Sequence, residues 1–280
     1  MESAMPLTIE NLTPVIGAEV SGIDLNTISA DQAAILRELL AERGVLVIRD
    51  QNLDHEAHKR VGSLFGTGTL HRHPLATASG SADPEVLTVK ATAKSAHAAG
   101  EGWHTDVSCD PAPISTSLLY MHQMPESGGG DTVFASMTEA FALLSEPVRA
   151  LIAQLSAVHD GSLPWREAYG RHPEAGAEFN RSVHPMVIAH PDTGKPLLWV
   201  NRGFTTRIAG VSKLESRALL EMLFQHIEST PRLQCRVRWD ARTLVIWDNI
   251  ATQHHAVWDY FPYTRHAERV SAVGGLLKAA

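Results

Sequence analysis

The feature that most restricts the fold is a histidine and an aspartate two residues apart, combined with another histidine near the other end of the chain. His104 and Asp106 lie in Gly-Trp-His-Thr-Asp-Val (102–107), and His254 ends Trp-Asp-Asn-Ile-Ala-Thr-Gln-His (247–254). If residues 102–107 form a strand, the side chains of His104 and Asp106 point to the same face. Two imidazoles and one carboxylate with open positions beside them are the ligand set of non-haem Fe(II) oxygenases. This hypothesis requires a fold that brings residue 254 next to residues 104 and 106.

Other histidines offer alternatives, because the chain has 15 of them. His190-Pro191-Asp192 is a second His-x-Asp, but the proline and the following Thr-Gly predict a turn, in which alternation does not align the two side chains. His71-Arg72-His73 is a possible metal pair of the kind that cupins use, although no glutamate follows at a matching distance. His255 adjoins His254, and neighbours on a strand point to opposite sides, so only one can face a metal. The residues alone leave that choice open.

The composition is that of an ordinary globular protein. The chain has 280 residues, of which 44% are hydrophobic and 20% charged, so it can bury a full core. A net charge of −7 provides no basic footprint for nucleic acid. No apolar run approaches the ~18 residues of a membrane helix. Two cysteines and a first segment without the features of a signal peptide lead us to expect a cytoplasmic protein.

Periodicity predicts many short strands and a few helices. Apolar spacing and capping residues predict helices at 29–43, 55–65, 137–155 and 212–228. Apolar or alternating segments predict strands at 7–9, 15–20, 44–49, 117–122, 131–134, 184–188, 196–200, 234–239, 243–247 and 267–273. Residues 91–102 and 161–180 are expected to be loop insertions.

This pattern favours an α+β fold with a mostly β core, a double-sheet jelly roll with flanking helices. A doubly wound α/β fold is the alternative, but strands and helices do not alternate regularly enough for it. We find no internal repeat or linker, so we expect residues 1–280 to form a single domain.

Two arginines follow the C-terminal histidine at spacings of 11 and 15 residues, Arg265 and Arg269. Being four apart, they lie on one face of either a strand or a helix. Two interpretations stay open: a solvated basic edge, or a guanidinium that binds the far carboxylate of a dicarboxylate co-substrate in bidentate fashion. Thr132 would be a second donor to that carboxylate, although a lone threonine is usually only a strand residue.

Taken together, these segments resemble the Fe(II)- and 2-oxoglutarate-dependent dioxygenases of the taurine dioxygenase family, over roughly residues 7–275. The matching segments, in order, are Trp-His-Thr-Asp-Val (103–107), Gly-Gly-Asp-Thr (129–132), Val-Asn-Arg-Gly-Phe-Thr-Thr-Arg-Ile (200–208), Trp-Asp-Asn with Thr-Gln-His (247–254) and the two arginines. The resemblance implies a double-stranded β-helix, and 2-oxoglutarate and O₂ as co-substrates that yield succinate and CO₂.

The resemblance also implies roles for individual residues. It implies that iron is bound by His104, Asp106 and His254, and not by His255. It implies that Arg269 and Thr132 hold the distal carboxylate of 2-oxoglutarate, with Arg265 near the other end of the molecule. Because an aspartate occupies position 106, no ligand position is vacated for halide, and hydroxylation is expected.

The primary substrate is less constrained. The taurine enzymes hold a sulfonate with a histidine, the backbone after the aspartate and the arginine end of the site; His73, Val107 and Arg269 stand at the matching places, with Phe204 as a possible apolar wall. His73 is equally compatible with a structural role in the core.

This chain departs from the taurine pattern at Ala76 and Gly100, where that pattern has a tyrosine and an asparagine. An ammonium-bearing substrate loses polar partners by this change, at a cost on the order of 1–3 kcal/mol per unpaired buried group. We therefore expect a small organic anion, such as an alkyl sulfonate or sulfate with a less polar tail than taurine. A carboxylate or aryloxy acid is the alternative substrate.

A zinc-dependent hydrolase is the alternative class, since the same three ligands could activate a water molecule. A hydrolase would not need the paired arginines, and 2-oxoglutarate would not change its activity. The resemblance also favours a homo-oligomer, a dimer or tetramer.

Overall fold

Short β-strands provide most of the regular structure in the computed structural model, which describes residues 7–78, 81–96, 98, 100–164 and 178–280. Within these residues the strands form four sheets. The largest has seven strands in the order β1-β2-β3-β13-β5-β15-β4, and all neighbours are antiparallel except β2 and β3. Its strands are β1 Thr8–Asn11, β2 Ala18–Ser21, β3 Val45–Ile48, β4 Leu87–Ala91, β5 Ile114–Gln123, β13 Leu244–Asp248 and β15 Arg265–Val273.

A second sheet, in the order β12-β6-β14, faces the large one. Its strands are β6 Thr132–Ser136, β12 Gln234–Val237 and β14 Thr252–Ala256. One buried cluster joins the two sheets, since it contains Val47 and Val245 from the large sheet together with Phe134 from the small one. Two sheets that share one apolar layer are the core of a jelly roll, so the expected fold class is confirmed.

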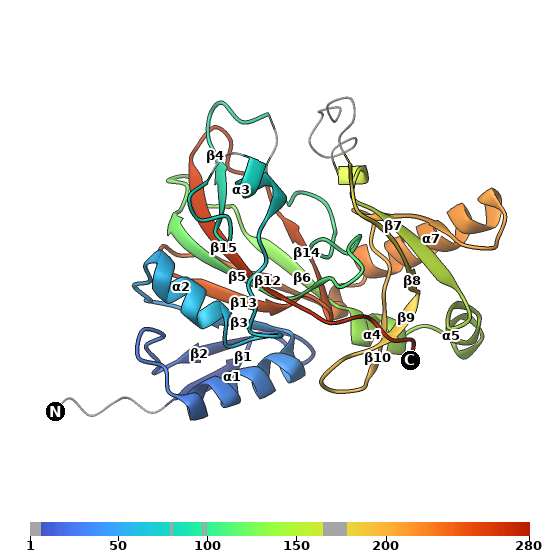
Figure 1. Ribbon diagram of the computed structural model, residues 1–280, viewed down its shortest axis with the longest axis horizontal. Coiled ribbons are helices and arrows are strands. Elements are labelled where there is room, and N and C mark those ends of the chain that lie inside the picture. The colour runs from blue at the N-terminus through green and yellow to red at the C-terminus, as the bar shows by residue number, and fades with distance from the viewer. Residues whose placement is uncertain (1–6, 79–80, 97, 99, 165–177) are drawn as a thin grey trace.

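Two helices cover the outer face of the large sheet, α1 Ala30–Arg43 and α2 His55–Gly62 (Figure 1). Their apolar side chains form a separate cluster with the alternate residues of β3, Leu46 and Ile48. β3 is thus buried on both faces, as its continuous apolar sequence predicts. Ser29 and Gln32 form the expected capping box of α1, and Gly44 ends this helix at a φ of 71°. A short helix, α3 Pro74–Ala78, precedes β4.

The remaining elements lie around a third apolar cluster beside the jelly roll, on the right in Figure 1. Their strands are β7 Ser156–Asp160, β8 Arg181–Pro185, β9 Val187–Ala189, β10 Pro196–Leu198 and β11 Thr205–Ile208. Their helices are α4 Met137–Ala142, α5 Glu146–Ile152, α7 Lys213–Glu228 and the 3₁₀ helix η1 Pro231–Leu233. α7 begins at the expected capping box of Ser212 and Glu215.

Two helix predictions need correction. The helix expected over 137–155 is two helices, because Ser145 starts a new one with Pro147 in its first turn. Proline has no amide hydrogen to donate to the preceding turn, and its ring clashes with that turn. The helix expected over 55–65 already ends at Gly62. The loop insertions expected at 91–102 and 161–180 lie partly outside the described residues, namely at 97, 99 and 165–177.

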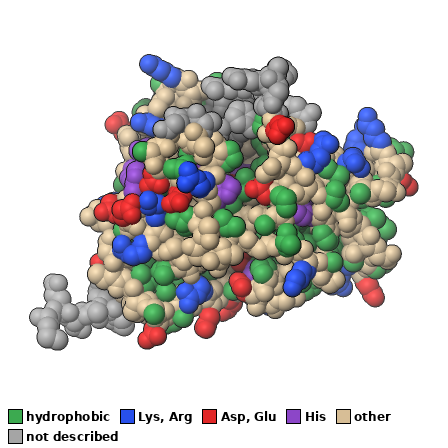
Figure 2. All heavy atoms as spheres, viewed as in Figure 1, with side chains coloured by type: hydrophobic (Ala, Val, Ile, Leu, Met, Phe, Trp, Pro, Cys, Tyr) green, Lys and Arg blue, Asp and Glu red, His purple; other side chains and the backbone are tan. Residues whose placement is uncertain are grey.

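Acidic and basic side chains are interspersed over the face seen in Figure 2. Within the described part of the chain, no helix combines the length and the apolar character needed to cross a membrane.

Candidate active site

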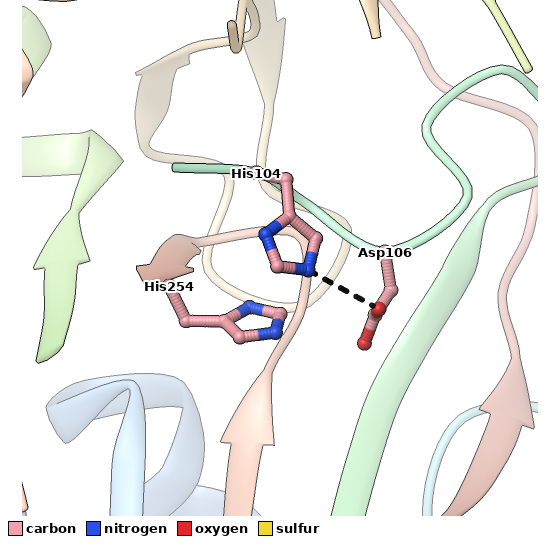
Figure 3. Close-up of side chains that lie close together, drawn as sticks. All are labelled: His104, Asp106 and His254. Carbon is pink, nitrogen blue, oxygen red and sulfur yellow. Dashed lines mark ion pairs between the residues drawn. The ribbon is translucent and has the colours of Figure 1, made fainter. Parts of the chain in front are cut away.

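Three side chains with metal-binding atoms converge between the two sheets of the jelly roll. His104 precedes β5, His254 lies on β14, and the two backbones are bridged by His104 N–H to His254 O at 3.0 Å and His254 N–H to His104 O at 2.9 Å. Nε2 of His104 is 3.8 Å from Oδ1 of Asp106. One potential ligand atom from each of the three residues lies within 4.8 Å of the others, and their side chains point toward one another (Figure 3). The fold therefore brings residue 254 next to residues 104 and 106.

The segment that carries His104 and Asp106 is not the expected strand. Only His104 makes a β-bridge, and residues 106–109 form a turn in which Val107 has a φ of 43°. This conformation is strained for a β-branched residue. Asn249 fixes the turn, since its Oδ1 accepts from Asp106 N–H and its Nδ2 donates to Asp106 O, both at 3.0 Å. The carboxylate reaches the histidines through this turn and not through strand alternation.

The electrostatics of the cluster favour the protonation states that a divalent cation requires. Burial alone would raise the pKa of Asp106, but the charge of Arg269, which is bonded to its Oδ1, holds that pKa well below its usual range. Burial lowers the pKa of both His104 and His254. The carboxyl group is therefore ionised and the imidazoles are neutral, as in metal ligands.

Hydrogen bonds around the cluster also fit a metal ion. Nδ1 of His104 lies 2.8 Å from the carbonyl oxygen of Gly102, so Nδ1 donates and Nε2 is left to face the cluster. Ser117 Oγ donates to Oδ2 of Asp106 at 3.1 Å. Nδ1 of His254 is buried and has no hydrogen-bond partner among the described residues, which is costly for a polar atom. This donor set is of the type that binds Fe(II).

A cavity of about 480 Å³ opens beside the three residues. Every residue that the sequence assigned to metal, co-substrate or substrate lines it: His73, His104, Asp106, Val107, Thr132, Phe204, His254, Arg265 and Arg269. Apolar side chains form much of the remaining wall: Leu87, Val89, Leu119, Phe134, Leu163 and Pro164.

Arg265 is a buried cation with an unused hydrogen-bond donor. It is 5% exposed, and its Nε donates to Gly130 O at 3.1 Å. Its Nη2 is buried without a hydrogen-bond partner in the described part of the chain. The nearby carboxylate of Asp131 is bound to Arg236 at 2.6 Å. A buried guanidinium without a matching anion is unfavourable unless a ligand supplies one.

Trp239 connects Arg265 with Thr132. The guanidinium carbon of Arg265 lies 5.5 Å from the centre of the indole ring, and Nε1 of Trp239 donates to Oγ1 of Thr132 at 3.0 Å. Because the Thr132 oxygen accepts from Trp239, its own hydroxyl hydrogen is left to donate to a ligand. Arg265, Thr132 and Trp239 thus form one corner of the cavity, in which Nη2 of Arg265 and the hydroxyl hydrogen of Thr132 are available as donors.

Arg269 lies at a different place on β15. Both arginines line the cavity, as expected for one face of a strand. Four residues of strand separate their backbones by roughly 13 Å. Arg269 is bonded to Asp106, whereas Arg265 shares Trp239 with Thr132. This arrangement differs from the expected pairing of Arg269 with Thr132.

His73 and Phe204 also line the cavity. Burial, with a further contribution from the charge of Arg269, lowers the pKa of His73 to about 3, so this ring is neutral. Phe204 is held by its backbone amide, which donates to Oδ1 of Asn201 at 2.9 Å. His255 accepts a hydrogen bond from Gly102 N–H at 2.8 Å and stacks on Trp103, with ring centres 5.9 Å apart. It is not a member of the three-residue cluster.

Sequence reasoning missed three residues that shape the site: Trp239, Asn249 and Ser117. Asn249 belongs to a segment that was noted, Trp-Asp-Asn, but its partner is 143 residues away in sequence. Trp239 ends a predicted strand and resembles a core residue. Only the three-dimensional contacts distinguish these side chains from ordinary packing.

Comparison with known proteins agrees with this geometry. A family model described as "Taurine catabolism dioxygenase TauD, TfdA family" matches residues 8–271. An alpha-ketoglutarate-dependent sulfonate dioxygenase of Saccharomyces cerevisiae is 34% identical, over 96% of this chain and 68% of that protein. An alpha-ketoglutarate-dependent sulfate ester dioxygenase of Pseudomonas putida is 32% identical, over 97% of this chain and 91% of that protein.

Solved structures show the same relationship. The crystal structure of a taurine dioxygenase from Burkholderia xenovorans has a TM-score of 0.83 at 32% identity, covering 98% of this chain and 91% of that one. The crystal structure of AAD-2 in complex with Mn(II) and N-oxalylglycine has a TM-score of 0.80 at 26% identity, covering 96% and 98%. Fold and relatives define a dioxygenase that depends on 2-oxoglutarate, which is another name for alpha-ketoglutarate. The chain belongs to the taurine catabolism dioxygenase family described as TauD, TfdA.

Proposed function

We propose that His104, Asp106 and His254 hold Fe(II), and that the protein hydroxylates a small organic anion while 2-oxoglutarate and O₂ are converted to succinate and CO₂. The observation that carries this proposal is the buried, unmatched guanidinium of Arg265 in the same cavity as two histidines and a carboxylate. When bound, Fe(II) supplies the redox chemistry that activates O₂. The protein's own residues bind and orient 2-oxoglutarate and the substrate, and they exclude water from the site.

Arg265 and Thr132 bind the distal carboxylate of 2-oxoglutarate. The guanidinium offers its free Nη2, and the Thr132 hydroxyl donates beside it because Trp239 already occupies its acceptor side. This assignment replaces Arg269, which the family resemblance paired with Thr132, by Arg265. AAD-2, the structural relative with 26% identity, was crystallised with N-oxalylglycine and Mn(II).

Arg269, His73 and the turn at Val107 bind the anionic group of the primary substrate. Arg269 supplies positive charge next to Asp106, and the neutral imidazole of His73 supplies a hydrogen-bonding group beside it. Phe204 and the apolar wall of the cavity take up a hydrocarbon tail. The preferred substrate is therefore an alkyl sulfonate or sulfate with a tail less polar than that of taurine.

A carboxylate or aryloxy acid is the second candidate substrate. A relative from Delftia acidovorans with 27% identity is named a (S)-phenoxypropionate/alpha-ketoglutarate-dioxygenase. The same arginine end would bind its carboxylate, and the apolar wall would contact its ring.

The experiment that tests the proposal is a screen for substrate-triggered succinate formation. Purified protein with Fe(II), 2-oxoglutarate and air is supplied with sulfonates, sulfates, carboxylates or aryloxy acids of increasing tail length. We expect stoichiometric succinate and oxidised product, fastest with a long-tailed sulfonate or sulfate. Turnover of taurine at the same rate would contradict the substrate assignment. Activity that needs zinc and ignores 2-oxoglutarate would support the hydrolase instead.

We further propose that the protein is a cytoplasmic homo-oligomer, a dimer or tetramer, of single-domain chains. The two cysteines, both free and buried, support a reducing compartment. Light scattering at micromolar concentration tests the oligomeric state, and a monomeric mass would contradict it.

A further inference from the structure

His190 belongs to the second His-x-Asp segment, which lies in the turn between β9 and β10 and takes no part in the three-residue cluster. Its side chain is buried, at 3% exposure. Nδ1 of the ring accepts hydrogen bonds from the backbone amides of Asp192, at 3.1 Å, and Thr193, at 3.2 Å. An atom that accepts two hydrogen bonds carries no proton, so the ring hydrogen is on Nε2.

Nε2 of His190 donates this hydrogen to Oδ2 of Asp248 at 2.8 Å. Burial lowers the pKa of His190 and the Asp248 carboxylate raises it, with the carboxylate prevailing. The two amides nevertheless leave no acceptor for a second ring proton, so we assign the neutral ring. The bond to Asp248 needs only the Nε2 hydrogen and does not depend on a charged imidazole.

Asp248 uses its other carboxylate oxygen to shape the turn between β13 and β14. Oδ1 accepts the amides of Ile250 and Ala251, both at 2.9 Å, and Asp248 itself is 6% exposed. Without His190, Oδ2 would be a buried carboxylate oxygen that lacks this donor. Such a group is strongly unfavourable, and the turn would rearrange to reach another donor or water.

This turn is connected to two of the three candidate metal ligands, Asp106 and His254. Asn249, next to Asp248, binds the backbone of Asp106 through two hydrogen bonds of 3.0 Å. β14 leaves the same turn and places His254. A shift of the turn would therefore move the carboxylate and one imidazole at the same time.

We propose that His190 is a positioning residue for the metal site, acting through Asp248 on the turn that places Asp106 and His254. The inference rests on the proposed binding of Fe(II) at His104, Asp106 and His254. His190 touches neither metal nor substrate, so it is not a catalytic residue.

Two conservative variants separate this role from simple packing. In His190→Asn the side-chain oxygen can still accept the amides of the turn, but the side chain is too short to reach Asp248. In His190→Gln the side-chain amide can still donate to Asp248. His226→Ala is the control, because His226 is a half-buried histidine on α7 that is bonded to Ala140 O at 2.9 Å and not to Asp248.

The measurements are the anaerobic dissociation constant for Fe(II), the visible absorption spectrum of the Co(II)-loaded protein, and Tm with and without metal. Loss of an outer-shell partner typically weakens metal affinity by about 10- to 100-fold. We expect about tenfold weaker Fe(II) binding, an altered Co(II) spectrum and a smaller metal-induced rise in Tm for His190→Asn. We expect near wild-type values for His190→Gln and His226→Ala.

Equal metal affinity and identical Co(II) spectra for wild type and His190→Asn would overturn the inference, even if both Tm values of the variant fell together. Equal losses in His190→Gln and His190→Asn would overturn it as well. Failure of the wild type to bind Fe(II) would contradict the proposed function instead, so the two failures are distinguishable.

Discussion

The guanidinium of Arg265 is a buried group whose hydrogen-bonding capacity is only partly used by the described residues. It is buried, it lies over the indole of Trp239, and its Nη2 has no hydrogen-bond partner in the described residues. A charge in this state destabilises the empty protein and becomes favourable when a carboxylate enters. The residue is therefore better suited to ligand binding than to stability.

Arg265→Met tests this trade between stability and binding. Removing one partner of a buried charge pair costs about 2–5 kcal/mol, so we expect 2-oxoglutarate to bind roughly 30-fold more weakly or worse. The metal-free variant should have an unchanged or higher Tm, because an unmatched buried charge is gone. Anaerobic titration and thermal unfolding measure the two effects.

The control for Arg265→Met is Arg232→Met, which removes an exposed arginine bonded to Glu139 at 3.1 Å. It should leave 2-oxoglutarate binding unchanged. Wild-type affinity in Arg265→Met would refute the role of this guanidinium.

Trp239→Phe tests whether the indole orients the Thr132 hydroxyl. The variant keeps an aromatic ring under Arg265 but loses the donor to Oγ1 of Thr132. Loss of one hydrogen bond is worth about 0.5–1.5 kcal/mol, so 2-oxoglutarate affinity should fall by roughly 2- to 12-fold. In a double-mutant cycle with Thr132→Val the two effects should not add. Strict additivity would show that the two side chains act independently.

At the scale of elements, capping residues and apolar segments correctly predicted those helix ends and strands that depend on neighbouring residues. The capping boxes at Ser29 and Ser212 and the apolar segment of β3 depend on neighbouring residues, and the structure agrees with them. The single helix predicted over 137–155 is wrong, because Pro147 lies in the first turn of a second helix that begins after Ser145. The strand predicted over 102–107 is wrong, because Asn249, which is distant in sequence, holds Asp106 in a turn.

For the candidate site, the sequence predicted the residues better than their individual roles. Side-chain chemistry, spacing and the family resemblance together pointed to nine residues, and all nine line the cavity. The resemblance paired Arg269 with Thr132, whereas in the structure it is Arg265 that shares Trp239 with Thr132 and Arg269 that is bonded to Asp106. This distinction depends on Trp239 and Asp106, which reach β15 from other elements.

Gly203→Ala tests the fit between the loop before β11 and the segment that carries His104. A Cβ at position 203 would lie 2.7 Å from Cβ of His104, which cannot swing away as the end of a flexible side chain could. Overpacking costs typically 1–3 kcal/mol, which is about 5- to 140-fold in metal affinity if it falls on the bound form. Titration with Fe(II) measures this.

Gly275→Ala is the matched control for Gly203→Ala, because a Cβ there would meet nothing within 4 Å. It should bind metal as the wild type does. Equal affinity in both variants would mean that the loop yields without moving His104.

At the scale of the whole molecule, buried neutral histidines make stability depend on pH. Burial lowers the pKa of His58 to about 4, and the pKa values of His73 and His159 to about 3. In the unfolded chain these groups take up protons near pH 6.5, so the unfolded state binds more protons at lower pH. Their contribution to stability is present above about pH 6.5 and is lost as pH falls toward 3 to 4.

We therefore expect Tm of the metal-free protein to fall between pH 7.5 and pH 5. Each fully titrating histidine contributes about 1.4 kcal/mol per pH unit to the free energy of unfolding below pH 6.5. Thermal unfolding in chelator-treated buffers measures the slope. A Tm that is constant over this range would mean that these histidines are accessible to protons in the folded state.

The most direct test of the whole account is anomalous diffraction at the iron edge from crystals grown anaerobically with Fe(II) and 2-oxoglutarate. We predict one strong iron peak within bonding distance of His104, Asp106 and His254, with the distal carboxylate of 2-oxoglutarate on Arg265 and Thr132. An iron peak elsewhere, or a distal carboxylate bound by Arg269, would contradict it.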